Sequence, residues 1–195
     1  LRSTVKIGTT RGTVMPILAK SSKNFDLAFC PERILEGQAL KDLRELPQII
    51  GGVNLKSAIR AAQFFQFITP TVIKVSTSDT AELIKLVDNA SRDVIFAFSN
   101  EVARICDAIG VSAQEVIRAG KLGYPRTNLP MPGPVGGPCL EKDTYILVES
   151  LERFGIVPEI MMTSRKVNER RPKETVAFLT DITKKLAGFP EEPII

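Results

Sequence analysis

The sequence contains no histidine. Histidine is the usual general acid or base of enzymes and the commonest metal ligand, so proton transfer here must fall to lysine, aspartate and glutamate side chains. We therefore expect no metal site. A thiol hydrolase or acyl transferase is disfavoured for the same reason, because those enzymes normally activate their cysteine with a histidine.

Cysteine is also scarce, with three residues in a chain of 195. Their odd number and wide spacing argue against a disulfide framework and suit a reducing compartment, so we expect a cytoplasmic protein. No apolar run approaches the about 18 residues that a membrane-spanning helix needs, so we expect no membrane contact. The net charge of +4 comes from scattered basic residues, which argues against a nucleic-acid partner.

The first third of the chain alternates between short apolar runs and helical patterns. Strands are predicted at residues 27–29, 48–50 and 72–75, with another beginning at residue 1, and helices at residues 13–19 and 55–67. This alternation predicts an α/β region with a parallel sheet covered by helices. Gly51-Gly52 is interpreted as a turn at a strand end. A GxGxxG fingerprint is absent, so we expect the phosphate-binding half of any dinucleotide fold to lie upstream of Leu1.

One helical period runs over residues 79–109, which corresponds to roughly 45 Å of helix. A helix this long usually joins domains or forms an interface, because globular helices average about 11–12 residues. Asp79 with Glu82 has the form of a capping box at its start. Ser112 with Glu115 has the same form and predicts a short helix. After a loop rich in proline and glycine, further helices are predicted at residues 140–154, 158–168 and 173–186.

Cys139 directly follows that loop and opens an amphipathic run, which places it at or beside a helix N-terminus. Unpaired backbone N–H groups and the helix dipole at such a position favour the thiolate, and Lys142 adds a positive charge nearby. We interpret Cys139 as a candidate nucleophile. The alternative is a small apolar residue that fills the junction between loop and helix.

Three polar pairs share a spacing of four residues, which on a helix places both side chains on one face. They are Glu32 with Glu36, Lys85 with Asn89, and Cys139 with Asp143. Each pair alone is weak evidence, because solvated helix faces show the same pattern. Together they supply a nucleophile, a cation and an amide for an oxyanion, and carboxylates for proton transfer.

Three motifs follow one another along the chain: Cys30–Gly37 (CPERILEG), Glu82–Asn89 (ELIKLVDN) and Gly136–Asp143 (GGPCLEKD). In order and approximate spacing they resemble the UDP-glucose/GDP-mannose dehydrogenase family. Ser3–Val5 with Gly8–Thr10 resembles the Ser-Thr-Val segment late in that family's cofactor domain. The resemblance covers nearly the whole chain.

In that family a central helical domain joins two Rossmann-like domains, which bind NAD and the nucleotide sugar. The resemblance implies that residues 1–78 are the C-terminal part of the NAD-binding domain, residues 79–187 an all-α central domain, and residues 188–195 the start of a linker. It also implies a homodimer through the long helix at residues 79–109. Because both ends of the chain look cut, we expect a fragment that is inactive alone.

The family's reaction is an NAD-dependent four-electron oxidation of C6 of a nucleotide sugar to the uronic acid, through a thiohemiacetal and a thioester on cysteine. The resemblance makes Cys139 the nucleophile and Lys85 and Asn89 the oxyanion donors. Its other catalytic assignments are Glu32, Glu36 and Asp143 for proton transfer and water orientation, with Thr4 hydrogen-bonded nearby. It assigns Ser3, Thr4, Val5, Glu36 and Lys142 to the cofactor, and Glu32, Lys85, Asn89, Arg126, Pro130, Gly133 and Gly136 to the substrate. The division of acid–base roles among the three carboxylates stays open.

The identity of the sugar also stays open. Cys30, before the Pro-Glu-Arg run, resembles the branch that oxidises UDP-N-acetylhexosamines, whereas Lys142 is shared with the UDP-glucose and GDP-mannose branches. We expect a UDP-N-acetylhexosamine or UDP-glucose, with GDP-mannose as an alternative. A non-catalytic dimerisation module is a further alternative, against which the presence of Cys139, Lys85 and Asn89 argues.

Overall fold

The computed structural model describes residues 1–22 and 24–190. The chain forms two compact units: Leu1–Ala90 with Lys142–Pro158, and Ser91–Glu141 with the chain from Glu159 onward. This division differs from the expected domains, because one long helix and the helix that carries Cys139 each contribute to both units. The expected domain boundaries stay a prediction, and residues 191–195 of the expected linker lie outside the described residues.

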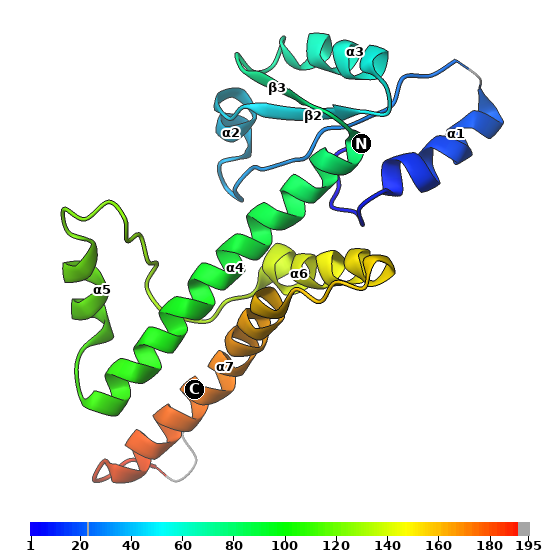
Figure 1. Ribbon diagram of the computed structural model, residues 1–195. Helices are drawn as coiled ribbons and strands as arrows, with labels where there is room; N and C mark the ends of the chain where they lie inside the picture. Colours follow the sequence, from blue (N-terminus) through cyan, green and yellow to red (C-terminus); the bar gives the residue numbers. More distant parts are fainter. Residues whose placement is uncertain (23, 191–195) are drawn as a thin grey trace. The chain divides into compact units, whose positions relative to one another are not determined.

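The helices and strands are labelled in Figure 1. In chain order they are the π-helical turn η1 (Thr10–Val14), α1 (Met15–Ser21), β1 (Ala28–Phe29), α2 (Ala39–Glu45), β2 (Gln48–Gly52), α3 (Leu55–Phe65), β3 (Val72–Val75), α4 (Ser78–Ile109), α5 (Ala113–Lys121), α6 (Gly137–Leu151), the 3-10 turn η2 (Glu152–Phe154) and α7 (Glu159–Lys185). An α/β region is thus followed by a helical region with one long helix, which confirms the fold class expected from the sequence. Within the described chain, no helix combines the length and hydropathy needed to cross a membrane.

β2 is the central strand of a three-stranded sheet in the first unit. It runs parallel to β3, with Gln48 opposite Val72, and antiparallel to β1, with Gly51 opposite Phe29. The three predicted strands are confirmed at nearly the same residues, but the prediction of a parallel sheet is wrong for β1. After β1 the chain passes through α2 and enters β2 at the same end of the sheet where β1 finishes, so the two strands run in opposite directions. A parallel pair would need a connection that crosses to the other end of the sheet.

Leu1 does not belong to a strand, contrary to the prediction, although its backbone pairs with the chain around β1. Its amine donates to the carbonyl of Ala28 at 2.8 Å, and its carbonyl accepts from the N–H of Cys30 at 2.7 Å. The early helices also differ from the prediction: α1 is preceded by η1, and α2 was not predicted from the sequence. Asn54 caps α3, because its Oδ1 accepts from the N–H of Ser57 at 2.8 Å.

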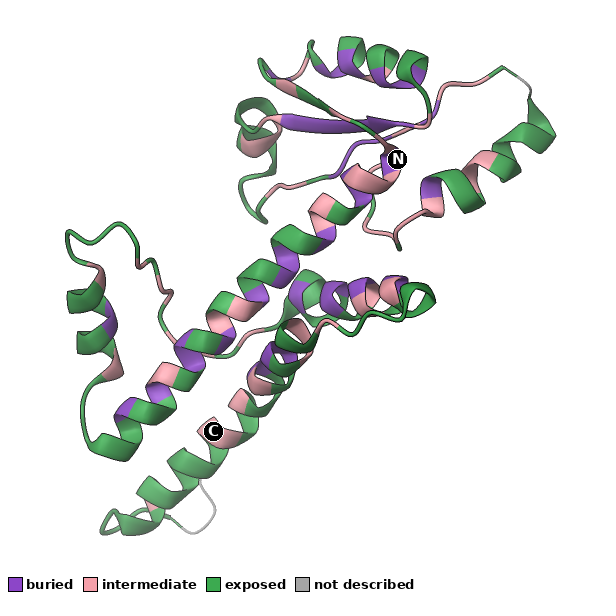
Figure 2. Cartoon of the chain, viewed as in Figure 1, coloured by how far each residue is buried: buried purple, intermediate pink, exposed green. Residues whose placement is uncertain are grey.

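Both faces of β2 are covered, and Figure 2 shows this strand buried along its length. Because successive side chains of a strand point to opposite faces, Ile50 and Ile49 enter different apolar clusters. One cluster contains Cys30, Ile50, Ala58, Ala62 and Phe65, and the other contains Phe29, Ile49 and Ala81. α3 therefore covers one face of the sheet and the beginning of α4 covers the other.

Gly51 and Gly52 are the last two residues of β2, so they lie at a strand end as interpreted, but they belong to the strand and do not form a turn. A Cβ atom on Gly51 would lie 2.2 Å from the carbonyl oxygen of Thr77, and one on Gly52 would lie 2.5 Å from the backbone nitrogen of Ala58. Glycine in a strand commonly marks such a close backbone approach. These two residues let α3 and the start of α4 pack directly on the strand.

α4 confirms the long helix predicted at residues 79–109. Its first turn is capped by Thr77, whose Oγ1 accepts from the N–H of Thr80 at 3.0 Å. The capping box predicted from Asp79 and Glu82 is therefore wrong, and the Glu82 carboxylate has other partners. The cap predicted at α5 is present, because Ser112 Oγ accepts from the N–H of Glu115 at 3.3 Å.

α7 runs unbroken through Pro172, so the prediction of two helices separated there is wrong. Proline in a helix interior costs about 3 kcal/mol because it lacks an N–H and its ring clashes with the preceding turn. Tertiary packing can offset that cost. Arg165 and Asn168, in the two turns before Pro172, are 1% and 0% exposed, so α7 is packed on that side of the proline.

Candidate active site

Two of the predicted site residues of the first unit, Asn89 and Lys142, meet at a third, Asp143, which is a fully buried residue of α6. Its Oδ2 accepts a hydrogen bond of 2.6 Å from Asn89 Nδ2 of α4. Its Oδ1 accepts one of 2.6 Å from Lys142 Nζ, whose side chain is half exposed. Both oxygens of this carboxylate thus have a donor, and three predicted site residues form one connected group.

Lys85 lies one turn before Asn89 on α4, so the predicted helix face is present. The Lys85 ammonium donates to the backbone carbonyl of Glu32, while the Glu32 side chain is exposed. The chain from Glu32 to Glu36 is not helical. The shared helix face suggested by the spacing of Glu32 and Glu36 is therefore wrong, and the structure does not bring their carboxylates to Asp143.

Cys139 belongs to the first turn of α6, which begins at Gly137, as predicted. It is exposed, whereas Cys30 and Cys106 are buried. Burial raises the pKa of the Cys30 thiol above its ordinary value. An exposed thiol does not fill an apolar junction, so the exposure favours the reactive interpretation of Cys139. Cys139 and Asp143 are four residues apart on one helix, which places them on one of its faces.

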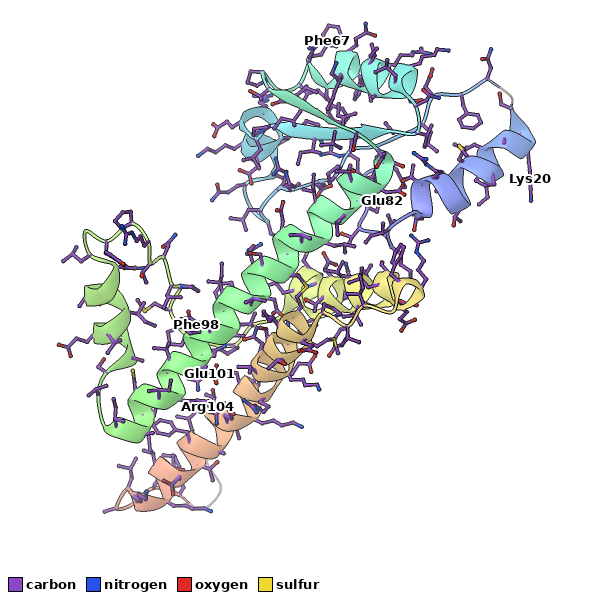
Figure 3. The ribbon with its side chains drawn as sticks, in the orientation of Figure 1. Lys20, Phe67, Glu82, Phe98, Glu101 and Arg104 are labelled. Carbon is purple, nitrogen blue, oxygen red and sulfur yellow. The ribbon has the colours of Figure 1, made fainter. Side chains whose placement is uncertain are left out.

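Glu82 holds the segment that follows the predicted cofactor residues. Its carboxylate is buried and accepts from the N–H of Gly8 at 2.6 Å, the N–H of Thr10 at 2.8 Å and the hydroxyl of Thr10 at 2.6 Å. Figure 3 labels Glu82 in the first turns of α4. The sequence analysis missed this role. The sequence feature that could have indicated this role is the position of Glu82 four residues before Leu86, which places both side chains on the buried face of the helix.

Three of the residues predicted to contact the cofactor form an irregular stretch at Ser3–Val5. Val5 packs against the cluster around Phe29 and Ile49, Thr4 is half-buried and Ser3 is exposed. The stretch offers two hydroxyl groups and follows backbone that pairs beside β1. Dinucleotides bind beyond the ends of such strands, so these residues fit the polar edge of an NAD molecule.

The loop before α6 in the second unit holds the remaining predicted substrate residues, Arg126, Pro130, Gly133 and Gly136. The Arg126 guanidinium lies 5.9 Å from the ring centre of Tyr124, and both side chains are exposed. Gly133 is held by Asn100 of α4: its N–H donates to Asn100 Oδ1 at 2.8 Å, and its carbonyl accepts from Asn100 Nδ2 at 3.0 Å. Asn100 fixes the loop backbone and was not singled out in the sequence.

Arg165 of α7 is a third buried residue that the sequence analysis missed. Its Nη1 donates to Asp93 Oδ1 at 2.8 Å and to the carbonyl of Leu140 at 3.0 Å, and its Nη2 donates to the carbonyl of Val135 at 3.0 Å. Asn168 Nδ2 donates to Asp93 Oδ1 at 2.8 Å. Burial raises the pKa of the Asp93 carboxyl above its ordinary value, against the opposing effects of the Asn168 hydrogen bond and the Arg165 charge.

A short sheet thus leads into one long helix that carries Lys85 and Asn89. The chain belongs to the UDP-glucose/GDP-mannose dehydrogenase family. It matches the NAD binding domain of the family over residues 1–69 and the central domain over residues 79–170. Membership therefore rests on two separate domains in the family's order.

Individual relatives agree with this family. The chain is 37% identical over 161 residues to a UDP-N-acetyl-D-mannosamine dehydrogenase from Methanococcus maripaludis, an alignment that covers 82% of this chain and 36% of the relative. It is 36% identical over 170 residues to an NDP-N-acetyl-D-galactosaminuronic acid dehydrogenase from Ralstonia nicotianae, covering 87% and 38%. The structure of a UDP-D-ManNAc dehydrogenase from Pyrococcus horikoshii superposes with a TM-score of 0.85 at 31% identity, covering 94% and 44%. The chain thus spans about two fifths of the length of these relatives.

Proposed function

We propose that this chain is part of an NAD-dependent 6-dehydrogenase that oxidises a UDP-N-acetylhexosamine to the uronic acid. The observation that carries the proposal is the buried hydrogen bond between Asn89 and Asp143, which joins residues from two motifs of the family resemblance. The relatives from Methanococcus and Pyrococcus are named for UDP-N-acetylmannosamine, which favours this sugar over UDP-glucose and GDP-mannose. Because the chain spans 36% of the Methanococcus relative, we propose that it does not turn over substrate alone.

When bound, NAD supplies the hydride acceptor for the two oxidations. The residues that would hold it are Ser3, Thr4, Val5, Glu36 and Lys142. The hydroxyl groups of Ser3 and Thr4 suit hydrogen bonds to a polar cofactor, and the ammonium of Lys142 suits its negative charge. The buried contacts of Glu82 keep the chain that follows Val5 in one conformation.

The chain's own residues act at the two steps in which no hydride moves. In the first, the Cys139 sulfur adds to the C6 aldehyde carbon and forms a C–S bond, and the carbonyl oxygen becomes an oxyanion. Lys85 and Asn89 donate to that oxygen. Lys85 has three N–H donors and uses one on the carbonyl of Glu32. Asn89 has two and uses one on Asp143.

The second step is hydrolysis of the thioester. Water adds to the C6 carbonyl carbon, a nearby carboxylate accepts one of its protons, and the C–S bond breaks to release the Cys139 thiolate and the uronic acid. The acid then gives up its proton to solvent and becomes the uronate. Glu32, Glu36 and Asp143 are the proposed carboxylates, with the Thr4 hydroxyl as an orienting group. Arg126, Pro130, Gly133 and Gly136 are proposed to contact the sugar nucleotide.

We further propose that α4 forms a homodimer with a second copy of the chain. Several large apolar residues of α4 are exposed: Leu83, Val87, Ile95, Phe98, Ile105 and Ile109. Apolar residues over this length of helix are normally buried against something. Phe98→Glu (Phe98 is labelled in Figure 3) should convert a dimer to a monomer in light scattering. Phe67→Glu, at an exposed residue outside α4, is the control and should stay dimeric.

The activity is tested by NADH formation in the full-length protein with UDP-N-acetylmannosamine, UDP-N-acetylgalactosamine, UDP-glucose and GDP-mannose. We expect activity with the N-acetylated sugars and none with GDP-mannose. Absence of activity with all four would support the non-catalytic alternative. If the purified protein oxidised UDP-glucose or GDP-mannose faster than the N-acetylated sugars, the proposed substrate would be wrong.

Substitutions test the mechanism. Cys139→Ser should stop the reaction after the first oxidation or trap an ester, because a serine hydroxyl is a poor nucleophile without a base. Lys85→Ala should lower kcat by about 10²–10³, as for other oxyanion donors. Lys74→Ala, at an exposed lysine of β3, is the control. Acid formation by Cys139→Ser at near wild-type kcat would exclude the thioester.

A further inference from the structure

We propose that a buried polar network between α4 and α7 positions the backbone of residues 133–140, and through it the Cys139 thiol. The members of the network are Asp93 and Asn100 of α4 and Arg165 and Asn168 of α7, each at most 1% exposed. None of them belongs to a motif that carries the family resemblance. The inference rests on the proposed role of Cys139 and deepens it by naming residues that act through the backbone.

Arg165 makes the contacts nearest to the thiol. Its guanidinium donates to the carbonyls of Val135 and Leu140, both at 3.0 Å, and these two residues flank Cys139 in the sequence. Asp93 Oδ1 accepts a hydrogen bond from the same guanidinium at 2.8 Å. This contact helps to fix the plane of the guanidinium. A planar guanidinium with donors in a fixed fork can hold two carbonyls at a set separation, which a lysine cannot do.

Asn100 holds the other end of the segment. It both accepts from and donates to the backbone of Gly133, at 2.8 and 3.0 Å, as a paired strand would. Asn100 Nδ2 also donates to Asn168 Oδ1 at 3.0 Å, and Asn168 donates to Asp93 Oδ1. The anchors at Gly133, Val135 and Leu140 therefore belong to one connected network.

The segment needs such anchors because it has little regular structure of its own. Residues 125–136 contain no helix or strand apart from one turn, so their backbone groups must find partners elsewhere. A buried ion pair is a weak source of stability compared with apolar residues of similar size. The network's contacts to residues 133–140 are all made to backbone atoms. We therefore infer that the network fixes the backbone conformation of this segment and adds little to the stability of the protein. Misplacement of a reacting group by about 1 Å can cost about 100-fold in rate.

The test is the reactivity of Cys139 in folded full-length variants. The rate of its alkylation by iodoacetamide is followed by mass spectrometry of the peptide, with the buried Cys30 and Cys106 as references for unfolding. Asn100→Ala and Arg165→Lys should each lower kcat by about tenfold or more. Both should also slow alkylation, because a displaced sulfur loses the helix N-terminus that favours its thiolate. Ser99→Ala is the matched control, because Ser99 is buried on α4 and donates to Ile95 of its own helix. Its alkylation rate and kcat should match the wild type.

A purely structural network would give a different result. It would lower the melting temperature of both variants while the folded protein kept the wild-type alkylation rate, and that outcome overturns the proposal. If Asn100→Ala does not fold, Arg165→Lys decides by the same comparison. If the wild type oxidises no nucleotide sugar, the proposed function fails, but the alkylation rates still decide whether the network positions the thiol.

Discussion

Asn89 and Asp143 are joined by a buried hydrogen bond of 2.6 Å between Nδ2 and Oδ2, which links α4 to α6 in the first unit. Asp143 has no exposed surface, so its carboxylate depends on donors from the protein. One of them, Lys142, has a half-exposed side chain, which leaves Asn89 as the buried donor.

Asn89→Leu should destabilise the protein by about 1–3 kcal/mol, because it leaves one oxygen of a buried carboxylate without a donor. The measurement is the free energy of unfolding in urea. Ser91→Ala, at an exposed position of the same helix, is the control and should change little. An unfolding free energy of Asn89→Leu equal to that of the control would mean that Asp143 finds another donor.

Glu82→Gln should loosen the segment at Gly8 and Thr10. A neutral amide has one acceptor oxygen where the carboxylate has two, and hydrogen bonds to a charged group contribute about 1.5–3 kcal/mol each. We expect faster hydrogen exchange at the amides of Gly8 and Thr10. Glu101→Gln, at an exposed position of α4 (labelled in Figure 3), is the control. Unchanged exchange at both amides would show that Glu82 does not hold the segment.

Gly51→Ala should destabilise the first unit severely, by about 3 kcal/mol or more, because the added Cβ would meet the Thr77 carbonyl at 2.2 Å. Gly120→Ala is the matched substitution in a helix, where a Cβ meets nothing within 4 Å. It should be stabilising by up to about 1 kcal/mol. Thermal unfolding of both variants checks the pair, and a similar melting temperature for the two would contradict the close packing at Gly51.

The buried Asp93 predicts a pH dependence of stability. Its pKa is raised above the ordinary value of 3.8, so the folded state binds the proton more tightly than the unfolded state. Its stabilising contribution is therefore present at low pH and is lost as the pH rises through the folded-state pKa. The difference in unfolding free energy between wild type and Asp93→Asn should fall as the pH is raised above about 4. A difference that stays constant with pH would show that the pKa is not raised.

Local pattern was sufficient for several parts of the site. The face shared by Lys85 and Asn89 follows from helical periodicity, and the place of Cys139 in a first turn follows from the glycines and proline before it. Prediction from the local sequence pattern was wrong where one pattern was compatible with two structures. Glu32 and Glu36 have helical spacing in a segment that is not helical, and Glu82 has the position of a cap residue but binds Gly8 and Thr10 instead.

The sequence by itself determined the family, the long helix and the identity of the candidate nucleophile, because these depend on residue types at short and regular spacings. Only the tertiary structure decided which polar side chains are buried and what they bind. Arg165 lies 72 residues from Asp93, and Asn89 lies 54 residues from Asp143. A polar residue in the sequence shows its hydrogen-bonding capacity but not its partner, since the partner is chosen by packing between helices that are distant along the chain.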